Sequence, residues 1–228
     1  MGAGIEVRNN TGNLVIDSTF KNLVYITKGS VATGTAVDTF SWQSVNLNGL
    51  SGYPLVAVQS TAGAWATVRS YSNGASVVDI VAHGPVNTQV NYYVFALPTV
   101  RPTDNGGLEI YDATGALVFS GGYDYMKVMG RIDDDANIAN PPASLTLPTG
   151  KSYAVMQTSP IAFAKVVNQS SVPSQQDWYL YSFRACFSVN SNVITGVKDE
   201  FQIVHYGTTV PPNYGAAGSG FILDVTNF

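Results

Sequence analysis

The sequence predicts an all-β fold made of two tandem antiparallel β-sandwich domains that are related by an internal repeat. Short apolar runs recur about every ten residues and are bounded by Gly, Pro, Asn, Asp and Ser, as in antiparallel sandwiches. No segment combines sustained helical spacing of apolar residues with helix start and stop signals. Two stretches of the first half recur in the same order in the second half.

The expected strands follow the apolar runs and end at turn-forming residues. In the first half they fall near residues 4–8, 12–17, 22–27, 38–46, 53–60, 64–70, 76–82 and 88–96. In the second half they fall near residues 107–111, 116–120, 125–132, 143–147, 152–158, 161–168, 177–188, 192–195, 200–206 and 220–225. The second half therefore carries additional expected strands after the segments that match the first half.

The repeat consists of two aligned segments. Residues 4–29 align without a gap on residues 107–132, and residues 55–68 align on residues 153–166. The identical pairs of the first segment are Gly4/Gly107, Glu6/Glu109, Thr11/Thr114, Gly12/Gly115, Leu14/Leu117 and Val15/Val118. In the second segment the identical pairs include Gln59/Gln157 and Ala66/Ala164, and Trp65 stands opposite Phe163. The offset falls from 103 to 98 residues between the segments, as one loop deletion would produce.

The repeat predicts where the chain divides. The simplest interpretation is a first domain over residues 1–103 and a second over residues 104–228. The join near residues 100–106 reads VRPTDNG, and its Pro and Gly are typical of a linker. The alternative is a single larger sandwich with pseudo-twofold symmetry.

The stretch GLEIYDATGALVFSG, residues 107–121, is expected to form the first β-hairpin of the second copy. Gly115 fits a turn position with positive φ, which a β-carbon disfavours. Glu109 and its equivalent Glu6 lie inside apolar runs, where a carboxylate is costly unless it is exposed or hydrogen-bonded. Both are therefore candidate interaction residues. They either face outward from a sheet or receive hydrogen-bond donors at a domain or subunit contact.

The composition excludes several classes of partner. Charged residues make up 11% of the chain, less than half of the roughly 25% usual in soluble domains. The net charge is −4 and no cluster of cations occurs, so we expect no nucleic-acid binding. The apolar runs are shorter than the ~20 residues of a membrane span, and the N-terminal residues do not form a secretory signal. We therefore expect that the protein is synthesised in the cytoplasm and does not insert into a membrane.

The residues that most often carry catalysis lack the expected spacing. The two histidines, His83 and His205, have no second ligand at metal-site spacing, and no nucleophile-elbow motif is present. Cys186 has apolar flanks, which predict an inert buried thiol. We therefore predict a protein that is not an enzyme and has no cofactor. A β-sandwich hydrolase is a further hypothesis, because paired carboxylates need only spatial proximity.

Two other clusters are candidates for binding. Asp133, Asp134 and Asp135 offer adjacent carboxylates as candidate calcium ligands, although a solvated loop tip explains the run equally well. Tyr123, Tyr125 and Trp178 are candidate interaction residues, because Tyr and Trp in loops form sugar-stacking platforms or protein contacts. Alternating aromatic residues also occur in the cores of strands, and core is the interpretation for Trp65.

The opening motif of each copy resembles small virion proteins of tailed bacteriophages. The pattern is G-[LI]-E-[VI]-x-[ND]-x-[ST]-G-x-L-V, followed by an aromatic residue and a short strand. It covers about 25 residues in each copy, and the second copy departs from it at Ser120-Gly121, where Asp17-Ser18 stands in the first. The resemblance implies a structural protein encoded beside tail-tip or tail-fibre genes. It transfers no catalytic residues.

Composition and resemblance together predict a non-enzymatic structural protein at the tail tip or tail fibre of a tailed phage. Its expected partners are copies of itself and other virion tail proteins, and its expected location is the virion after assembly in the host cytoplasm. The alternative prediction is a host-adhesion module that binds a surface glycan or protein through the loop aromatics Tyr123, Tyr125 and Trp178.

Overall fold

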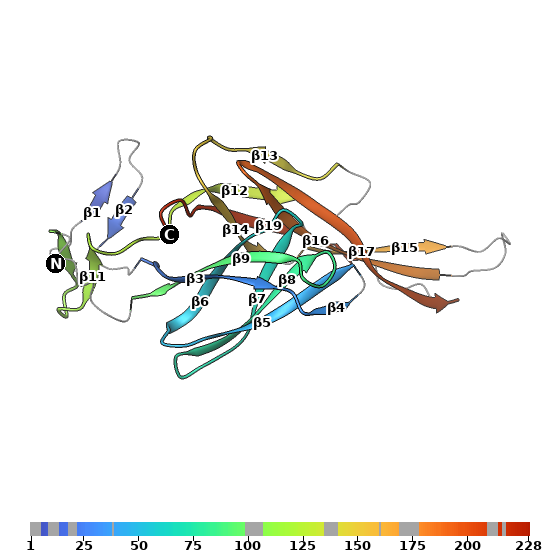
Figure 1. The fold of residues 1–228 in the computed structure, drawn as a ribbon, viewed down its shortest axis with the longest axis horizontal. Helices are drawn as coiled ribbons and strands as arrows, with labels where there is room; N and C mark the ends of the chain where they lie inside the picture. Colours follow the sequence, from blue (N-terminus) through green and yellow to red (C-terminus); the bar gives the residue numbers. More distant parts are fainter. Residues whose placement is uncertain are drawn as a thin grey trace.

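The computed structural model describes residues 6–8, 14–17, 22–37, 39–98, 107–134, 141–159, 161–168, 178–208, 214–215 and 218–228. These residues form antiparallel sheets and contain no helix, so the all-β antiparallel class is confirmed (Figure 1). None of the described residues belongs to a helix that could cross a membrane.

The strands follow the apolar runs closely. In the first half they are β1 (Glu6–Arg8), β2 (Leu14–Asp17), β3 (Val24–Ala32), β4 (Thr35–Val37), β5 (Phe40–Leu47), β6 (Ser51–Gln59), β7 (Ala64–Ser72), β8 (Ala75–His83) and β9 (Gln89–Leu97). In the second half they are β10 (Glu109–Tyr111), β11 (Leu117–Ser120), β12 (Val128–Asp134), β13 (Ser144–Thr146), β14 (Tyr153–Ser159), β15 (Ile161–Asn168), β16 (Trp178–Asn190), β17 (Val193–Gly207), β18 (Tyr214–Gly215) and β19 (Gly218–Asp224).

Three details of the strand prediction were wrong. The two strands expected at 192–195 and 200–206 form the single strand β17, which pairs with β16 along its whole length. The charged residues 198–200 do not interrupt β17, because cross-strand pairing with β16 continues through them. The short strands β4 and β18 have no separate signal in the sequence.

Both large sheets contain strands from both halves of the chain. One sheet has the order β12-β19-β14-β6-β9-β3, and the other has the order β13-β17-β16-β7-β8-β5-β4, with β15 on β16 and β18 on β15. The halves meet where Val155 of β14 pairs with Val58 of β6 and where Phe187 of β16 pairs with Ala64 of β7. These shared sheets favour a single sandwich with pseudo-twofold symmetry. The division at residue 103 stays a prediction, and the join near 100–106 lies outside the described residues.

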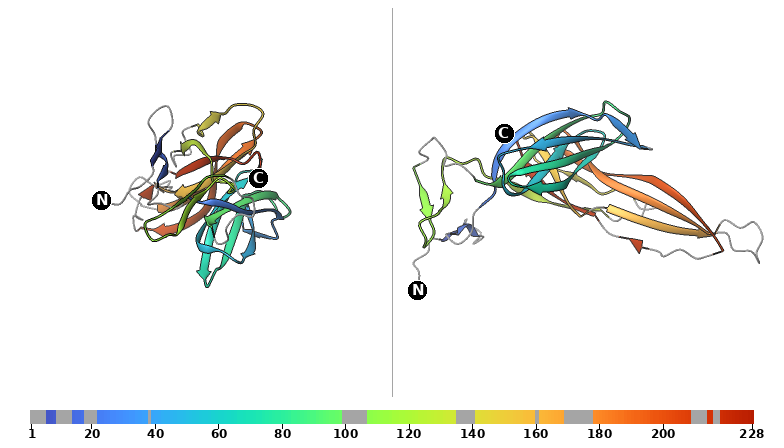
Figure 2. Two further views of the ribbon diagram at one scale, coloured as in Figure 1. Left: turned by 90° about the vertical axis from the view of Figure 1, so that its left-hand side faces the viewer. Right: turned by 90° about the horizontal axis from the view of Figure 1, so that it is seen from below.

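The two halves are similar in strand order and in hairpin register. In the first sheet β6-β9-β3 and β14-β19-β12 follow the same order outward from the junction. The hairpins β1-β2 and β10-β11 share one register, with Glu6 opposite Asp17 and Glu109 opposite Ser120, and each has an irregularity at the same place. Both hairpins lie at one end of the molecule, whereas β15, β16 and β17 extend toward the other end (Figure 2).

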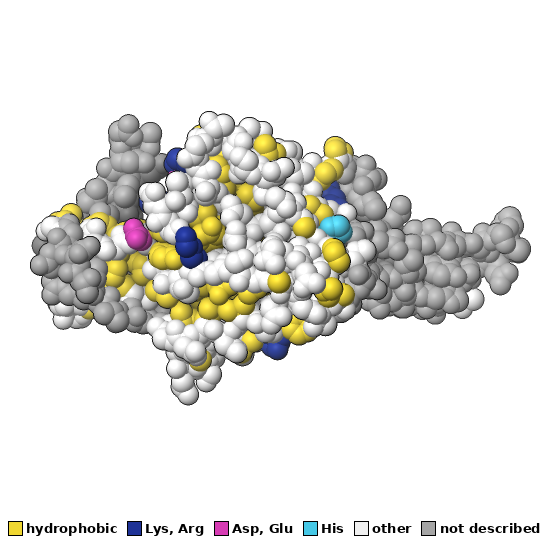
Figure 3. All heavy atoms as spheres, viewed as in Figure 1, with side chains coloured by type: hydrophobic (Ala, Val, Ile, Leu, Met, Phe, Trp, Pro, Cys, Tyr) yellow, Lys and Arg dark blue, Asp and Glu magenta, His cyan; other side chains and the backbone are white. Residues whose placement is uncertain are grey.

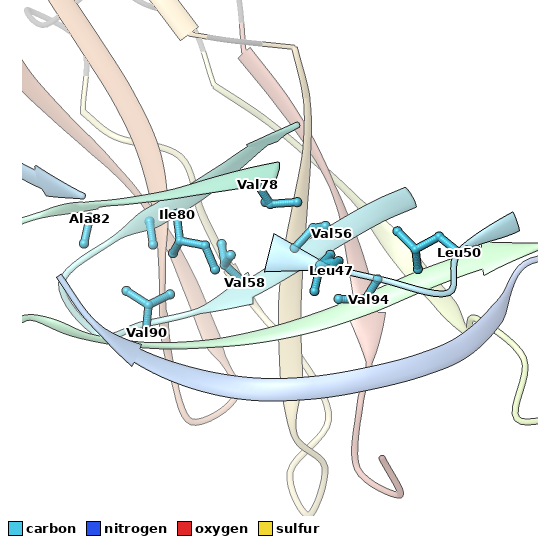
Figure 4. Packing of buried hydrophobic residues seen from close by; sticks show 11 residues of the cluster. Leu47, Leu50, Val56, Val58, Val78, Ile80, Ala82, Val90 and Val94 are labelled. Atoms are coloured by element: carbon cyan, nitrogen blue, oxygen red, sulfur yellow. The ribbon is translucent and has the colours of Figure 1, made fainter. Parts of the chain in front are cut away.

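The first half has its core between the two sheets. Strand β8 alternates between half-exposed and buried residues, and Val78, Ile80 and Ala82 point inward. They meet Val58 and Val94 from the opposite sheet (Figure 4). The second half has a corresponding cluster that includes Tyr153, Phe187 and Ile222. Period-two burial of this kind is what two packed sheets require.

A third cluster contains residues from both halves. Phe95 and Ala57 of the first half pack with Met156 and Leu223 of the second. Phe228 packs against this cluster; its ring stacks on Tyr25 at 4.7 Å and meets the Phe95 ring edge-on at 5.6 Å. Apolar burial therefore joins the halves in addition to the sheet pairing.

Asp224, at the end of β19, is a buried carboxylate with three hydrogen-bond donors. Its oxygens accept from Lys151 Nζ at 2.6 Å and from the backbone N and the hydroxyl of Thr226 at 3.1 and 2.6 Å. Burial alone would raise the pKa of Asp224, but the bonds from Lys151 and Thr226 outweigh it and lower the pKa to about 2. The ionised form is therefore the one that the fold stabilises.

We expect the free energy of unfolding to fall as the pH falls from about 4 to 2. The folded pKa of Asp224 lies below its ordinary value, so its contribution is complete above that value and is lost on protonation. Because Lys151 is partly exposed, the contribution is on the order of 1 kcal/mol. Urea unfolding at pH 2, 3, 4 and 6 measures it, and Asp224→Asn is the matched control. An equal pH dependence in the wild type and this variant would contradict the assignment.

Candidate functional site

A groove of about 570 Å³ lies where the two halves meet. Strands β6 and β7 of the first half form one side of it, and β14 and β19 of the second half form the other. Its lining residues are Tyr53, Pro54, Leu55, Val56, Trp65, Ala66, Thr67, Val68, Met156, Gln157, Thr158 and Phe221. A groove of this size falls within the range of about 300–1,000 Å³ found for ligand sites.

The groove exists because strand pairing stops at the junction. Strand β6 is paired with β14 only at Val58, and β7 is paired with β16 only at Ala64. Beyond these two residues the described pairings of β6 and β7 are with β9 and β8, on their other edges. Both strands therefore present an edge to the groove.

Aromatic side chains partly cover these edges. The Tyr53 hydroxyl, from β6, donates to the main-chain oxygen of Val68 on β7 at 3.1 Å. The rings of Tyr53 and Tyr71 lie 6.2 Å apart, and the Tyr71 hydroxyl accepts a bond from the Gly52 amide. Tyr53 is 58% exposed and Phe221 is 37% exposed. Such side chains reduce unwanted pairing at a sheet edge without closing it.

The lining is suited to binding and not to proton transfer. It contains no Asp, Glu, Lys, Arg, His or Cys, and its polar side chains are hydroxyls and the amide of Gln157. Its apolar members come from both faces of the strands, because the groove opens onto strand edges. The groove can therefore offer apolar contacts together with backbone hydrogen bonds.

No protein-family model, curated protein or solved structure matches this chain. The functional argument therefore depends on the residues and their geometry.

The aromatic candidates Tyr123 and Tyr125 lie together, away from the groove, at the base of the β10-β11 hairpin. Tyr125 stacks on Phe119 at 5.0 Å, and Tyr123 meets Tyr125 edge-on at 5.9 Å. The Tyr125 hydroxyl accepts a bond from the Ser120 amide at 2.8 Å and donates to the Ser120 carbonyl at 3.0 Å. Burial raises the pKa of Tyr125. Tyr125 thus fastens the hairpin to the chain that leads into β12.

We expect Tyr125→Phe to destabilise the protein by about 1–3 kcal/mol, because the N–H of the buried Ser120 loses the hydroxyl that accepts its hydrogen bond, while its C=O keeps only the bond from the Tyr123 amide. Urea unfolding measures the loss. Tyr111→Phe is the control, since the Tyr111 hydroxyl donates to the side chain of Glu109 and leaves no backbone group of Ser120 affected. A Tyr125→Phe variant as stable as the wild type would contradict this role.

The hairpin itself forms as expected. Asp112 Oδ1 accepts bonds from the amides of Thr114 and Ala116 at 2.8 and 2.9 Å, and Gly115 has φ +83°. Glu109 is half-buried and accepts a bond from the Tyr111 hydroxyl at 2.6 Å. A carboxylate in this apolar run is thus hydrogen-bonded.

The side chains of the equivalent Glu6 and of Trp178 lie outside the described part. The backbone of Glu6 lies in β1 opposite Asp17, and Trp178 begins β16 opposite Asn168. Their predicted roles as interaction residues stay predictions.

The first two members of the acidic run do not converge on one point. Adjacent residues of a strand face opposite sides, so Asp133 is exposed and pairs with Arg131, whereas Asp134 is buried and pairs with Lys198 at 2.9 Å. Asp135 lies outside the described residues. Within the described part of the chain, no group of three or more His, Cys, Asp or Glu residues is placed to hold a metal ion.

The remaining chemistry-bearing residues lie in packed surroundings. His83 meets the ring of Phe40 edge-on at 5.4 Å, and Cys186 is fully buried beside Gly63. The side chain of His205 is outside the described part. Trp65, expected in the core, is half-buried: it packs against Phe40 at 5.4 Å and also lines the groove. The repeat places Trp65 opposite Phe163, but the sequence assigned Trp65 to the core and did not predict the groove.

Proposed function

We propose that the protein is a non-enzymatic structural component of a tailed bacteriophage particle, at the tail tip or tail fibre. It docks on neighbouring virion proteins, and the junction groove is its principal contact. The observation that carries the proposal is the groove: an uncharged, mostly apolar site that opens onto strand edges with which no described strand pairs beyond Val58 and Ala64.

The composition of the described surface and of the groove lining is consistent with assembly. Charged side chains are sparse among the described residues on the face that Figure 3 shows, and hydrophobic side chains are spread over it. The cores of protein interfaces are depleted in charge and enriched in Tyr, Trp, Phe and Met. Tyr53, Trp65, Met156 and Phe221 supply these residue types in the groove.

The host-adhesion alternative has less support from the described geometry. A sugar-stacking platform needs an exposed aromatic face and free polar groups near it. Tyr125 places one face against Phe119 and bonds its hydroxyl to Ser120.

The test is the protein content of purified particles of the phage that encodes the chain. We expect peptides of this protein in particles purified by density gradient, and gold-labelled antibody at the tail end. Particles that contain none of it would contradict the proposal. A control antibody against the major capsid protein should label heads and not tails.

A further inference from the structure

The second half of the molecule shows what can cover a strand edge of this kind. In the repeat β15 corresponds to β7, with Phe163 and Ala164 in the places of Trp65 and Ala66. Each strand pairs antiparallel with the next long strand, β15 with β16 and β7 with β8. The other edge of β15 is paired with β18, in which Gly215 lies opposite Phe163 and Tyr214 opposite Ala164.

The equivalent edge of β7 has no such strand among the described residues. Its described pairing on that side is Ala64 with Phe187, and the next four residues, Trp65 to Val68, line the groove. The edge is thus open at the two positions where its counterpart is covered.

We propose that the groove binds an extended, uncharged peptide segment of a partner protein, which adds as a strand to the edge of β7 at Trp65–Val68. The inference rests on the proposed assembly function and names the form of the partner. Strand addition gains affinity from main-chain hydrogen bonds and specificity from pockets for alternate side chains.

Three observations select this occupant and this strand. The lining carries no charge, so a charged segment would lose solvation without finding an ion partner. Strand β6 contains Pro54, which has no amide hydrogen and cannot donate to an added strand, so β7 is the better edge. The Val68 carbonyl already accepts a bond from Tyr53 at the groove, which shows that backbone groups of β7 are within reach there.

The probe is a capped peptide with the chain's own sequence PPNYGAAGS (residues 211–219), which contains the edge-covering strand β18 (Tyr214–Gly215), and it is added to the full-length protein. We expect it to slow hydrogen exchange of the Trp65–Val68 amides that do not face β8. At a peptide concentration nine times the dissociation constant, exchange should slow about tenfold. Amides of β8 and β5 should not change.

Two matched variants locate the site. Thr158 is an exposed residue of the groove on β14, and Thr35 is an exposed residue of β4 outside it. Thr158→Lys places a charge in the groove and should weaken peptide binding about tenfold or more, the effect of 1.4 kcal/mol. Thr35→Lys adds the same charge elsewhere and should leave binding unchanged.

Several outcomes would overturn the inference. They are no binding by the peptide, binding without protection of Trp65–Val68, and equal weakening by the two variants. Protection that appears without peptide as the protein concentration is raised would assign the edge to a second copy of the chain instead. If the peptide fails to bind while the protein is found in particles, the strand-addition hypothesis is contradicted and the proposed assembly function is supported. If the peptide binds while particles lack the protein, the strand-addition hypothesis is supported and the proposed assembly function is contradicted.

Discussion

Lys198→Met should lower the free energy of unfolding by about 3–5 kcal/mol, because it leaves the buried carboxylate of Asp134 without its cation. Lys198 Nζ lies 2.9 Å from Asp134 Oδ1, and the two side chains are only 7% and 2% exposed. The other oxygen of Asp134 accepts a bond from the Ala143 amide at 3.3 Å. The pair joins β12 of one sheet to β17 of the other, so its loss affects the packing of the sheets. Urea unfolding followed by tryptophan fluorescence measures the change.

The control removes both charges together. The double variant Asp134→Asn with Lys198→Met retains the shape of the site and leaves no buried charge, so it should regain most of the lost stability. Asn is the appropriate replacement, because it keeps the size and shape of Asp in a site where the carboxylate fills the space that a β-carbon on Gly196 would take. A double variant as unstable as Lys198→Met alone would show that the loss comes from packing and not from the unpaired charge.

Phe95→Ala should lower the free energy of unfolding by about 3–5 kcal/mol, as is usual when a buried Phe is truncated. Phe95 is fully buried in the cluster that both halves share, where it contacts the rings of Tyr25 and Phe228. Since each large sheet also contains strands from both halves, we expect one unfolding transition that involves both halves. Calorimetry together with hydrogen exchange in each half measures this.

Ile80→Ala is the comparison for Phe95→Ala, because Ile80 lies in the core of the first half alone. In a single cooperative unit both variants shift the same transition, and Ile80→Ala costs about 2–5 kcal/mol. Two separate transitions, of which Ile80→Ala shifts only one, would contradict the single unit and support independent domains divided near residue 103.

Much of the fold could be predicted from local signals. The β10-β11 hairpin follows from Asp112 and Gly115, because a carboxylate that accepts backbone amides and a residue at positive φ together specify the turn. The strands of the first half follow from apolar runs with period-two burial, as in β8. The continuity of the long strand β17 could not be predicted from the sequence. Its charged middle fits into a sheet because β16 pairs with it and because Lys198 forms an ion pair with Asp134.

Most of the candidate site could not be predicted from the sequence. Met156 and Phe221 lie in apolar runs, from which the sequence would place them in the core. They line a groove because β14 pairs with β6 at a single residue and the two strands diverge beyond it. The aromatic residues that the sequence singled out include Tyr125, whose contacts with Phe119 and Ser120 are structural. Exposure of a side chain is a property of the assembled sheets, and composition does not encode it.

The sequence by itself determined the all-β class and the places of most strands, because turn chemistry and side-chain alternation act over short distances along the chain. Only the tertiary structure decided that the two halves share both sheets, that Asp133 and Asp134 separate, and that no described strand pairs with one edge of β7 beyond Ala64. These depend on which strands pair across long separations. Long-range pairing is selected by the total burial and hydrogen bonding of the folded chain, which no short segment specifies.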